Sequence, residues 1–252
     1  MLTEPPTVRI IAHRGASHAA PENTLPAFER AWNEGADAIE GDFHLTSDGG
    51  IVCIHDPDTK KLDDTRRKIR RCTLGQLRQL DAGFWFGPAF CGVRIPTFEE
   101  VAAQVPDGKG LVIEIKCGPE ILPPMLAQLQ ASRLLPEQVE VISFHKAVIA
   151  EIKKLAPQYR ALWLSKTSRD WRGRRKPSPQ ALCGILQELG ADGVGLQDTV
   201  YLDADQIGAV REAGLAVNVW TVDNAGRALE LIRFGASSIT TNCPGKIRGL
   251  LT

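Results

Sequence analysis

Short apolar runs recur along the chain and alternate with longer stretches in which apolar residues return every three or four positions. The short runs predict β-strands buried on both faces, and the longer stretches predict amphipathic helices that cover them. Predicted strands lie at residues 8–12, 38–43, 111–115, 139–143, 161–165, 193–196, 216–220 and 238–241. Predicted helices lie at residues 24–33, 119–133, 146–155, 179–189, 204–213 and 224–234, and a short one begins at Pro244.

The ends of these helices carry the expected capping residues. Glycine, which tolerates a left-handed C-terminal cap, follows four of them, at Gly35, Gly190, Gly214 and Gly235. Asp203 and Asp223 occupy positions typical of an N-cap. Eight strand–helix units within 252 residues favour an α/β fold of the closed (β/α)₈ TIM-barrel type, a single domain over residues 1–252. An open doubly wound sheet more often shows G-x-G-x-x-G after its first strand, and that motif is absent.

One segment interrupts the alternation. Residues 51–54 predict a short strand, joined to the strand before it by the turn-forming residues 47–50. Residues 57–96 then precede the third barrel strand, and we interpret them as a small insertion after the second strand, on the catalytic face. Its aromatic cluster, Phe84-Trp85-Phe86, either forms an apolar wall for a leaving alcohol or packs the insertion itself.

Charge and composition narrow the classes of function. The chain holds 30 basic and 30 acidic residues, so we expect no broad field that attracts nucleic acid or anionic membrane. Basic runs at 66–71 and 172–176 are local; a solvated loop is the favoured interpretation, and anion or surface binding the alternative. No stretch reaches the roughly 18 apolar residues that a membrane span needs, so stable membrane insertion is not expected.

The cysteines and the N-terminus indicate where the protein acts. Six cysteines are scattered without a C-x-x-C pair, which excludes a disulfide framework and a zinc site of the usual spacing. Residues 1–6 lack a basic segment followed by an apolar core, so we expect no signal peptide. A reducing, cytoplasmic location follows. The oligomeric state stays open, because no heptad or self-complementary pattern stands out.

Acidic side chains lie two residues apart near predicted strand ends. Glu40 and Asp42 therefore share one face of a strand, as do Glu114 and Lys116. Because the C-terminal ends of barrel strands build the active site, the three carboxylates are predicted to form an oxygen site for Mg²⁺ or Ca²⁺. The alternative is a buried ion pair of Glu40 or Glu114 with Lys116 or Arg14.

Two histidines end apolar runs next to charged residues. His13 precedes Arg14, and His55 precedes Asp56. Their near-neutral pKa range suits one as base and the other as acid around a phosphorus centre, although a single histidine at a strand end is more often structural. Three others lack a paired context, and we interpret them as structural: His18, His44 and His145.

Cations and one tryptophan complete the candidate site. Arg14 and Lys116 are predicted to hold phosphate oxygens, with a salt bridge from Arg14 to Glu22 or Glu40 as the alternative. Trp220 ends the seventh strand, where it either lines the substrate mouth or packs in the core. Thr24 or Asn23 is a candidate N-cap for the first helix.

With these residues in place, the chain resembles the glycerophosphodiester phosphodiesterase family. The resemblance rests on motifs that occur in family order along nearly the whole chain: His13-Arg14-Gly15, Pro21-Glu22-Asn23-Thr24, Glu40-Gly41-Asp42, Asp48-Gly49, His55-Asp56, Leu80-Asp81-Ala82-Gly83, Arg94-Ile95-Pro96-Thr97, Glu114-Ile115-Lys116 and Trp220-Thr221-Val222. The chain departs from the family after His55-Asp56 and at Asn242, where an aspartate is usual.

The resemblance implies a barrel hydrolase of glycerol and lipid metabolism. Such an enzyme cleaves a small glycerophosphodiester into glycerol 3-phosphate and an alcohol with a divalent cation. By position, Glu40, Asp42 and Glu114 match the metal ligands, and His13 and His55 match the acid–base pair. Arg14 and Lys116 match the phosphate contacts.

Two other functions stay open at this point. One is a phospholipase-type phosphodiesterase that acts on a lysophospholipid, as a lysophospholipase D, or on a phosphoinositide. The other is a catalytically silent barrel that binds phosphorylated metabolites. The sequence does not distinguish Mg²⁺ from Ca²⁺, the acid histidine from the base, a water nucleophile from the substrate's own 2-hydroxyl, or one alcohol head group from another.

Overall fold

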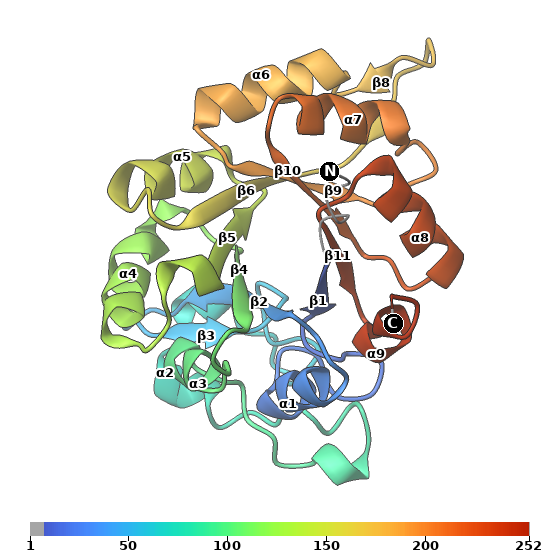
Figure 1. The fold of residues 1–252 in the computed structure, drawn as a ribbon. Coiled ribbons are helices and arrows are strands. Elements are labelled where there is room, and N and C mark those ends of the chain that lie inside the picture. Colours follow the sequence, from blue (N-terminus) through green and yellow to red (C-terminus); the bar gives the residue numbers. More distant parts are fainter. Residues whose placement is uncertain (1–7, 252) are drawn as a thin grey trace.

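Eight parallel strands close into a barrel in the computed structural model, which describes residues 8–251 (Figure 1). Each strand pairs with the next around the ring, and the last pairs with the first. The strands are β1 (Arg9–His13), β2 (Ala38–Leu45), β4 (Gly110–Ile115), β5 (Val139–Ser143), β6 (Arg160–Ser165), β9 (Gly193–Gln197), β10 (Ala216–Trp220) and β11 (Ser238–Thr241). The predicted TIM barrel is confirmed, whereas the interpretation of residues 1–6 lies outside the described residues.

Helices surround the barrel and cover its outer face (Figure 1). They are α1 (Leu25–Asn33), α2 (Leu74–Leu77), α3 (Phe98–Ala103), α4 (Leu122–Ala131), α5 (Lys146–Leu155), α6 (Pro179–Leu189), α7 (Ala204–Glu212), α8 (Ala225–Phe234) and α9 (Pro244–Arg248). The sequence pattern missed α2 and α3 because each is too short to show a helical period. It also missed a hairpin of two short strands, β7 (Ser168–Arg169) and β8 (Arg175–Lys176). These strands are polar and lack the apolar alternation of a buried sheet.

Capping side chains fix where the helices begin. Thr24 caps α1, and its hydroxyl accepts a hydrogen bond from the Ala27 amide. Asp203 caps α7 as predicted. The prediction for Asp223 was wrong, because Asn224 caps α8 instead. The Asp223 carboxylate accepts hydrogen bonds from Thr241 at the end of β11 and from the Asn242 amide that follows, and this places it beside the candidate site.

The barrel interior changes from apolar to polar along its axis. Side chains alternate along each strand, so every second residue faces inward. A small apolar cluster fills the centre, made of Ile11, Ala38, Val112, Ile142, Leu162 and Leu164. The next inward positions toward the C-terminal ends of the same strands include His13, Glu40 and Glu114. The larger apolar core lies between the strands and the helices, where it includes Phe28 and Phe98.

The segment from residue 57 to residue 96 follows β3 (Ile51–Cys53), which pairs antiparallel with β2. It contains two 3₁₀ turns, η1 (Ile69–Arg71) and η2 (Pro88–Phe90), on either side of α2. Its apolar side chains Ile69, Leu77 and Ile95 pack together against Val52. Two further 3₁₀ turns, η3 (Pro119–Ile121) and η4 (Pro136–Gln138), flank α4. Among the described residues, no helix has the length and apolar character needed to cross a membrane.

Replacing Phe98 by alanine tests whether α3 is packed against the barrel as observed. The Phe98 ring is fully buried and meets the ring of Phe43 edge-on at 5.3 Å. We expect Phe98→Ala to lower the free energy of unfolding by about 3–5 kcal/mol. Phe84→Ala is the control, because Phe84 is 47% exposed and its loss should change stability by no more than about 0.5 kcal/mol. Equal, small effects in a urea titration would contradict the packing.

Candidate active site

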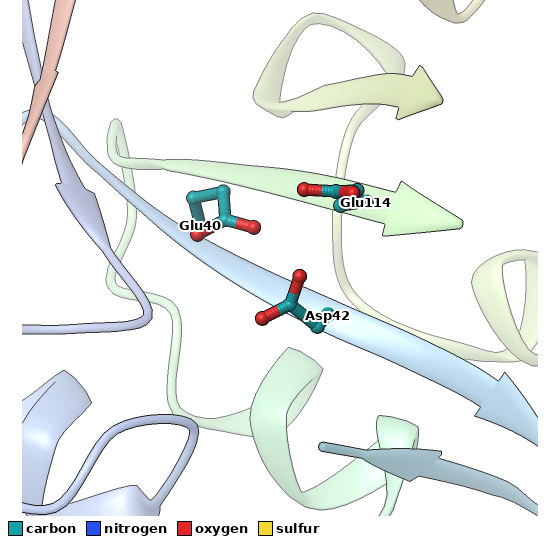
Figure 2. Close-up of side chains that lie close together, drawn as sticks. All are labelled: Glu40, Asp42 and Glu114. Atoms are coloured by element: carbon teal, nitrogen blue, oxygen red, sulfur yellow. The ribbon is translucent and has the colours of Figure 1, made fainter. Parts of the chain in front are cut away.

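Three buried carboxylates meet between the middle of β2 and the C-terminal end of β4 (Figure 2). The parallel register places Asp42 directly opposite Glu114, and Glu40 lies two residues before Asp42 on the same face. One oxygen from each carboxylate lies within 4.8 Å of the others. Neighbouring strands are about 4.8 Å apart, so this register alone brings the acids into one cluster.

Burial and neighbouring charges shift the pKa of all three acids. Burial, and then the charges of Asp42 and Glu114, raise the pKa of Glu40 well above its usual range. Burial and the charge of Asp42 raise the pKa of Glu114 to about 7, against the opposing effect of Lys116. Burial would also raise the pKa of Asp42, but Arg14, Lys116 and His55 outweigh it and lower that pKa to about 2. Asp42 is therefore the acid that the site keeps ionised.

Two cations lie against the acidic cluster. The Lys116 Nζ atom lies 2.7 Å from Glu114 and 3.3 Å from Asp42. The Arg14 guanidinium lies 3.2 Å from both Asp42 and Glu22. The ion pairs weighed as alternatives in the sequence are thus present in part, with Asp42 rather than Glu40 as the main partner of Arg14. Although burial opposes it, the neighbouring carboxylates raise the pKa of Arg14 and of Lys116, so both stay charged.

The loop after β1 reaches the acids through backbone conformations that few residues tolerate. Gly15 has a φ of +83°, and a Cβ there would lie 2.5 Å from the carbonyl carbon of Ala27. The Arg14 amide donates to Glu40 Oε2 at 2.8 Å. Asn23, at a φ of +56°, donates from Nδ2 to Asp42 Oδ2 and accepts from the Asp42 amide. Asn23 therefore orients an acid, whereas Thr24 is the helix cap.

A chain of hydrogen bonds holds the ring of His13. Asp223 can only accept, so the Asn242 amide nitrogen faces its Oδ2 atom at 2.6 Å, and the Asn242 oxygen faces His13 Nδ1 at 2.8 Å. Ser17 donates to the same Asn242 oxygen. His13 Nδ1 therefore carries a proton, and Nε2 is left as the acceptor. Burial, followed by the charge of Arg14, lowers the pKa of His13.

His55 enters the site from the end of the β2–β3 hairpin. Its Nδ1 atom lies 2.9 Å from Asp56 Oδ1. The side chain of His44 packs behind it, with Nε2 3.3 Å from the His55 carbonyl oxygen. Burial lowers the pKa of His44, so His44 is held neutral. The two candidate catalytic histidines thus have different partners at Nδ1, a neutral amide for His13 and a carboxylate for His55.

A cavity of about 150 Å³ unites these groups above the barrel interior. The Trp220 indole forms part of its wall and meets the Phe144 ring edge-on at 5.6 Å. A Cβ on Gly195 would lie 2.5 Å from Leu164 Cδ2 and 3.4 Å from Trp220 Nε1, so the glycine leaves room for both side chains. The full lining is His13, Arg14, Glu40, His55, Glu114, Lys116, Ile142, Phe144, Leu164, Lys166, Asn218, Trp220 and Thr240.

The cavity brings together most of the residues singled out from the sequence. Seven of the eight candidates line it, and Asp42 lies buried in the acidic cluster beneath. Sequence reasoning missed Phe144, Lys166 and Asn242, although each lies two positions beyond an inward-facing strand residue. They can be identified by continuing the two-residue alternation of inward-facing side chains past the end of each strand.

The acidic cluster has the chemistry of a divalent-cation site. All of its donors are carboxylate oxygens, which hard cations prefer. The Glu40 Oε1 atom is buried and has no hydrogen-bond partner among residues 8–251. Burying an oxygen without a partner costs free energy, unless a ligand binds to it. The cluster is therefore compatible with a divalent cation.

Neutralising one acid should stabilise the protein when a chelator removes divalent cations. We expect Glu40→Gln to raise the free energy of unfolding by about 0.5–2 kcal/mol, because it relieves repulsion among buried carboxylates. Glu140→Gln is the matched control, since this buried acid lies between Arg9 and Arg160 instead. It should lower that free energy, by about 0.5–3 kcal/mol. Denaturant titrations in chelator that show the same sign for both variants would contradict the repulsion.

The sequence profile of the Glycerophosphoryl diester phosphodiesterase family matches residues 13–246. The chain is 31% identical over 251 residues to a glycerophosphodiester phosphodiesterase of Caldanaerobacter subterraneus, covering 96% of this chain and 97% of the relative. A glycerophosphodiester phosphodiesterase of Bacillus subtilis is 29% identical, covering 96% of this chain and 86% of the relative.

A solved structure shows the same architecture. It is a phosphodiesterase of Oleispira antarctica in complex with the product sn-glycerol-3-phosphate, 27% identical, with a TM-score of 0.85 and 96% of each chain covered. The profile match spans more than nine-tenths of the chain and contains all eight candidate residues. The chain belongs to the glycerophosphoryl diester phosphodiesterase family.

Proposed function

We propose that the protein hydrolyses small glycerophosphodiesters to glycerol 3-phosphate and an alcohol, with Mg²⁺ or Ca²⁺ at Glu40, Asp42 and Glu114. The observation that carries this proposal is the convergence of those three acids with His13 and His55 at one cavity. The sn-glycerol-3-phosphate bound to the Oleispira phosphodiesterase supports it, as do full-length relatives named as enzymes. A catalytically silent barrel would have no need of a histidine pair, and the full-length relatives are named as enzymes.

The charges around the acids explain how a phosphate is held. A bound cation supplies Lewis-acid polarisation of a phosphoryl oxygen. Arg14 and Lys116 lie against the same carboxylates and offer a guanidinium fork and a point charge for the other phosphate oxygens. They stabilise the negative charge that grows on these oxygens during the reaction.

The hydrogen bonds of the histidines support different tasks for the two rings. His13 carries its proton on Nδ1, held by Asn242, so its Nε2 accepts the proton of the attacking hydroxyl, whether of water or of the substrate's 2-position. As the new oxygen–phosphorus bond forms and the bond to the alcohol breaks, His55 gives a proton to the leaving oxygen. Attack by the 2-hydroxyl would leave a cyclic phosphate, and water would then open that ring to give glycerol 3-phosphate. Asp56 orients the His55 ring for that transfer.

The apolar side of the cavity gives the remaining part of the substrate a surface. Trp220 and Phe144 line this part of the cavity, where their rings meet edge-on. We place the aliphatic part of the substrate there. Residues of the segment 57–96, Trp85 among them, line a second, smaller cavity together with His55. We therefore retain the proposal of one barrel domain over 1–252 with 57–96 as an insertion on the catalytic face.

Cysteine chemistry supports a reducing compartment such as the cytoplasm. All six cysteines are free, and Cys91 is exposed. An exposed free thiol persists best where disulfides do not form.

Removing either histidine should remove most of the activity. We expect His13→Ala and His55→Ala each to lower kcat on glycerophosphocholine by about 10²- to 10⁴-fold, because each removes one proton transfer. His145→Ala is the control: this exposed histidine follows β5 on the same face and should leave kcat unchanged. Near wild-type turnover by either of the first two variants would refute the acid–base assignment.

Chelation should abolish turnover without unfolding the protein. After exhaustive dialysis against a chelator, we expect no hydrolysis of glycerophosphocholine and full recovery on adding Mg²⁺ or Ca²⁺. The same cation at about 100 times its Kd should raise the free energy of unfolding by about 2.7 kcal/mol, and Glu40→Gln should reduce that gain. Full activity in chelator would remove the cation from the mechanism.

A further inference from the structure

A basic hairpin projects from the barrel between β6 and α6 (Figure 1). From Lys166 to Lys176 the chain carries six lysine or arginine side chains and a single acid, Asp170, although the whole chain is electrically balanced. The proposed hydrolysis uses none of the hairpin residues 168–176.

The one acid of the hairpin is already hydrogen-bonded within the turn. Asp170 Oδ1 accepts hydrogen bonds from the amides of Arg172 and Arg174, and its Oδ2 pairs with the Arg174 guanidinium. Arg175 pairs with Asp203 at the start of α7. Four exposed cations make no salt bridge within the described part of the chain, namely Lys166, Arg169, Arg172 and Lys176.

Large apolar side chains stand exposed beside these cations. Trp171 at the hairpin turn is 84% exposed, and the Arg172 guanidinium lies 4.3 Å from the centre of its ring. Val200, in the loop after β9, is 91% exposed, and the neighbouring Tyr201 is 41% exposed. The Arg169 guanidinium lies 5.9 Å from the Tyr201 ring, so the two loops form one surface.

Two contacts fix this surface on the face that holds the cavity. Thr199 donates to the carbonyl oxygen of Thr167, and Arg175 reaches Asp203, so the hairpin is tied to the loop after β9. Both loops leave the C-terminal ends of barrel strands, as the candidate site does. Lys166, which precedes the hairpin, lines the cavity itself.

We propose that this surface, formed by residues 168–176 together with Val200 and Tyr201, docks the protein on an anionic lipid bilayer. Arginine and lysine are attracted to anionic head groups, while tryptophan and tyrosine rings settle at the depth of those head groups. The exposed Val200 and the projecting shape of the hairpin favour a bilayer over a nucleic acid, because an aliphatic side chain gains nothing from a hydrated polyanion. Docking turns the cavity mouth toward lipid. The docking itself does not depend on the proposed hydrolysis.

Vesicle binding tests the proposal. We would measure co-sedimentation of the full chain with vesicles of phosphatidylcholine containing roughly one-third phosphatidylglycerol, near 0.1 M salt, and with pure phosphatidylcholine vesicles. We expect binding to the anionic vesicles only, weakened by added salt. The double variant Trp171→Ala/Arg172→Glu should bind at least about tenfold more weakly, since it removes the interfacial ring and reverses one charge.

A matched double variant controls for charge and for loss of an exposed apolar side chain. Lys154→Glu/Leu155→Ala makes the same change of charge at the end of α5, where Leu155 is 48% exposed, and should bind vesicles like the wild type. Both double variants should hydrolyse soluble glycerophosphocholine normally, which separates failed docking from a failed active site.

Three results would overturn the docking proposal. The first is no binding to the anionic vesicles, and the second is equal loss of binding in both double variants. The third is that Trp171→Ala/Arg172→Glu abolishes self-association or binding to polyuridylic acid but leaves vesicle binding intact. Quenching of tryptophan fluorescence by brominated lipid, lost on replacing Trp171, would instead place the ring in the bilayer and support the proposal.

Discussion

Repulsion among three carboxylates held out of water is the constraint on which the site depends. A closed parallel barrel fixes the register of its strands, so Glu40, Asp42 and Glu114 cannot move apart without breaking the β2–β4 ladder. With all three acids ionised, Lys116 and Arg14 would leave the cluster one positive charge short. Burial and this repulsion raise the pKa of both glutamates instead. The carboxylate oxygens of the cluster are compatible with a divalent cation, whose charge would oppose that repulsion.

The residues around the cluster orient its carboxylates through hydrogen bonds. Asn23 accepts a left-handed backbone to orient Asp42, and Gly15 allows the loop to pass Ala27 closely enough for the Arg14 amide to reach Glu40. Local strain of this kind persists where the rest of the fold enforces it. Two successive hydrogen bonds, from Asn242 to Asp223 and from His13 to Asn242, set the tautomer of His13. A residue just after the last barrel strand therefore determines which nitrogen of the histidine at the end of the first strand carries the proton.

The sequence predicted the barrel well, because strands buried on both faces and amphipathic helices have distinct periods. It also predicted the seven residues that line the cavity and Asp42 in the acidic cluster, since period two and the strand-end rule decide which side chains point there. The ion pairs of Asp42 were not predictable, because they depend on how Arg14 bends after β1. Asp223 was misread as a cap, since only the fold brings it to Asn242. Residues 172–176 are largely exposed, which agrees with the solvated loop favoured from the sequence, but sequence spacing does not show that Tyr201 lies beside the hairpin.

A crystal structure of the protein grown with Mn²⁺, with data collected at the manganese absorption edge, tests the central claim most directly. The claim is that the strand register makes the three acids one cation site. The predicted result is an anomalous peak within about 2.6 Å of an oxygen from each of Glu40, Asp42 and Glu114, with Lys116 moved away from Glu114. A saturated crystal without a peak among these carboxylates, with Lys116 still paired to Glu114, would contradict it.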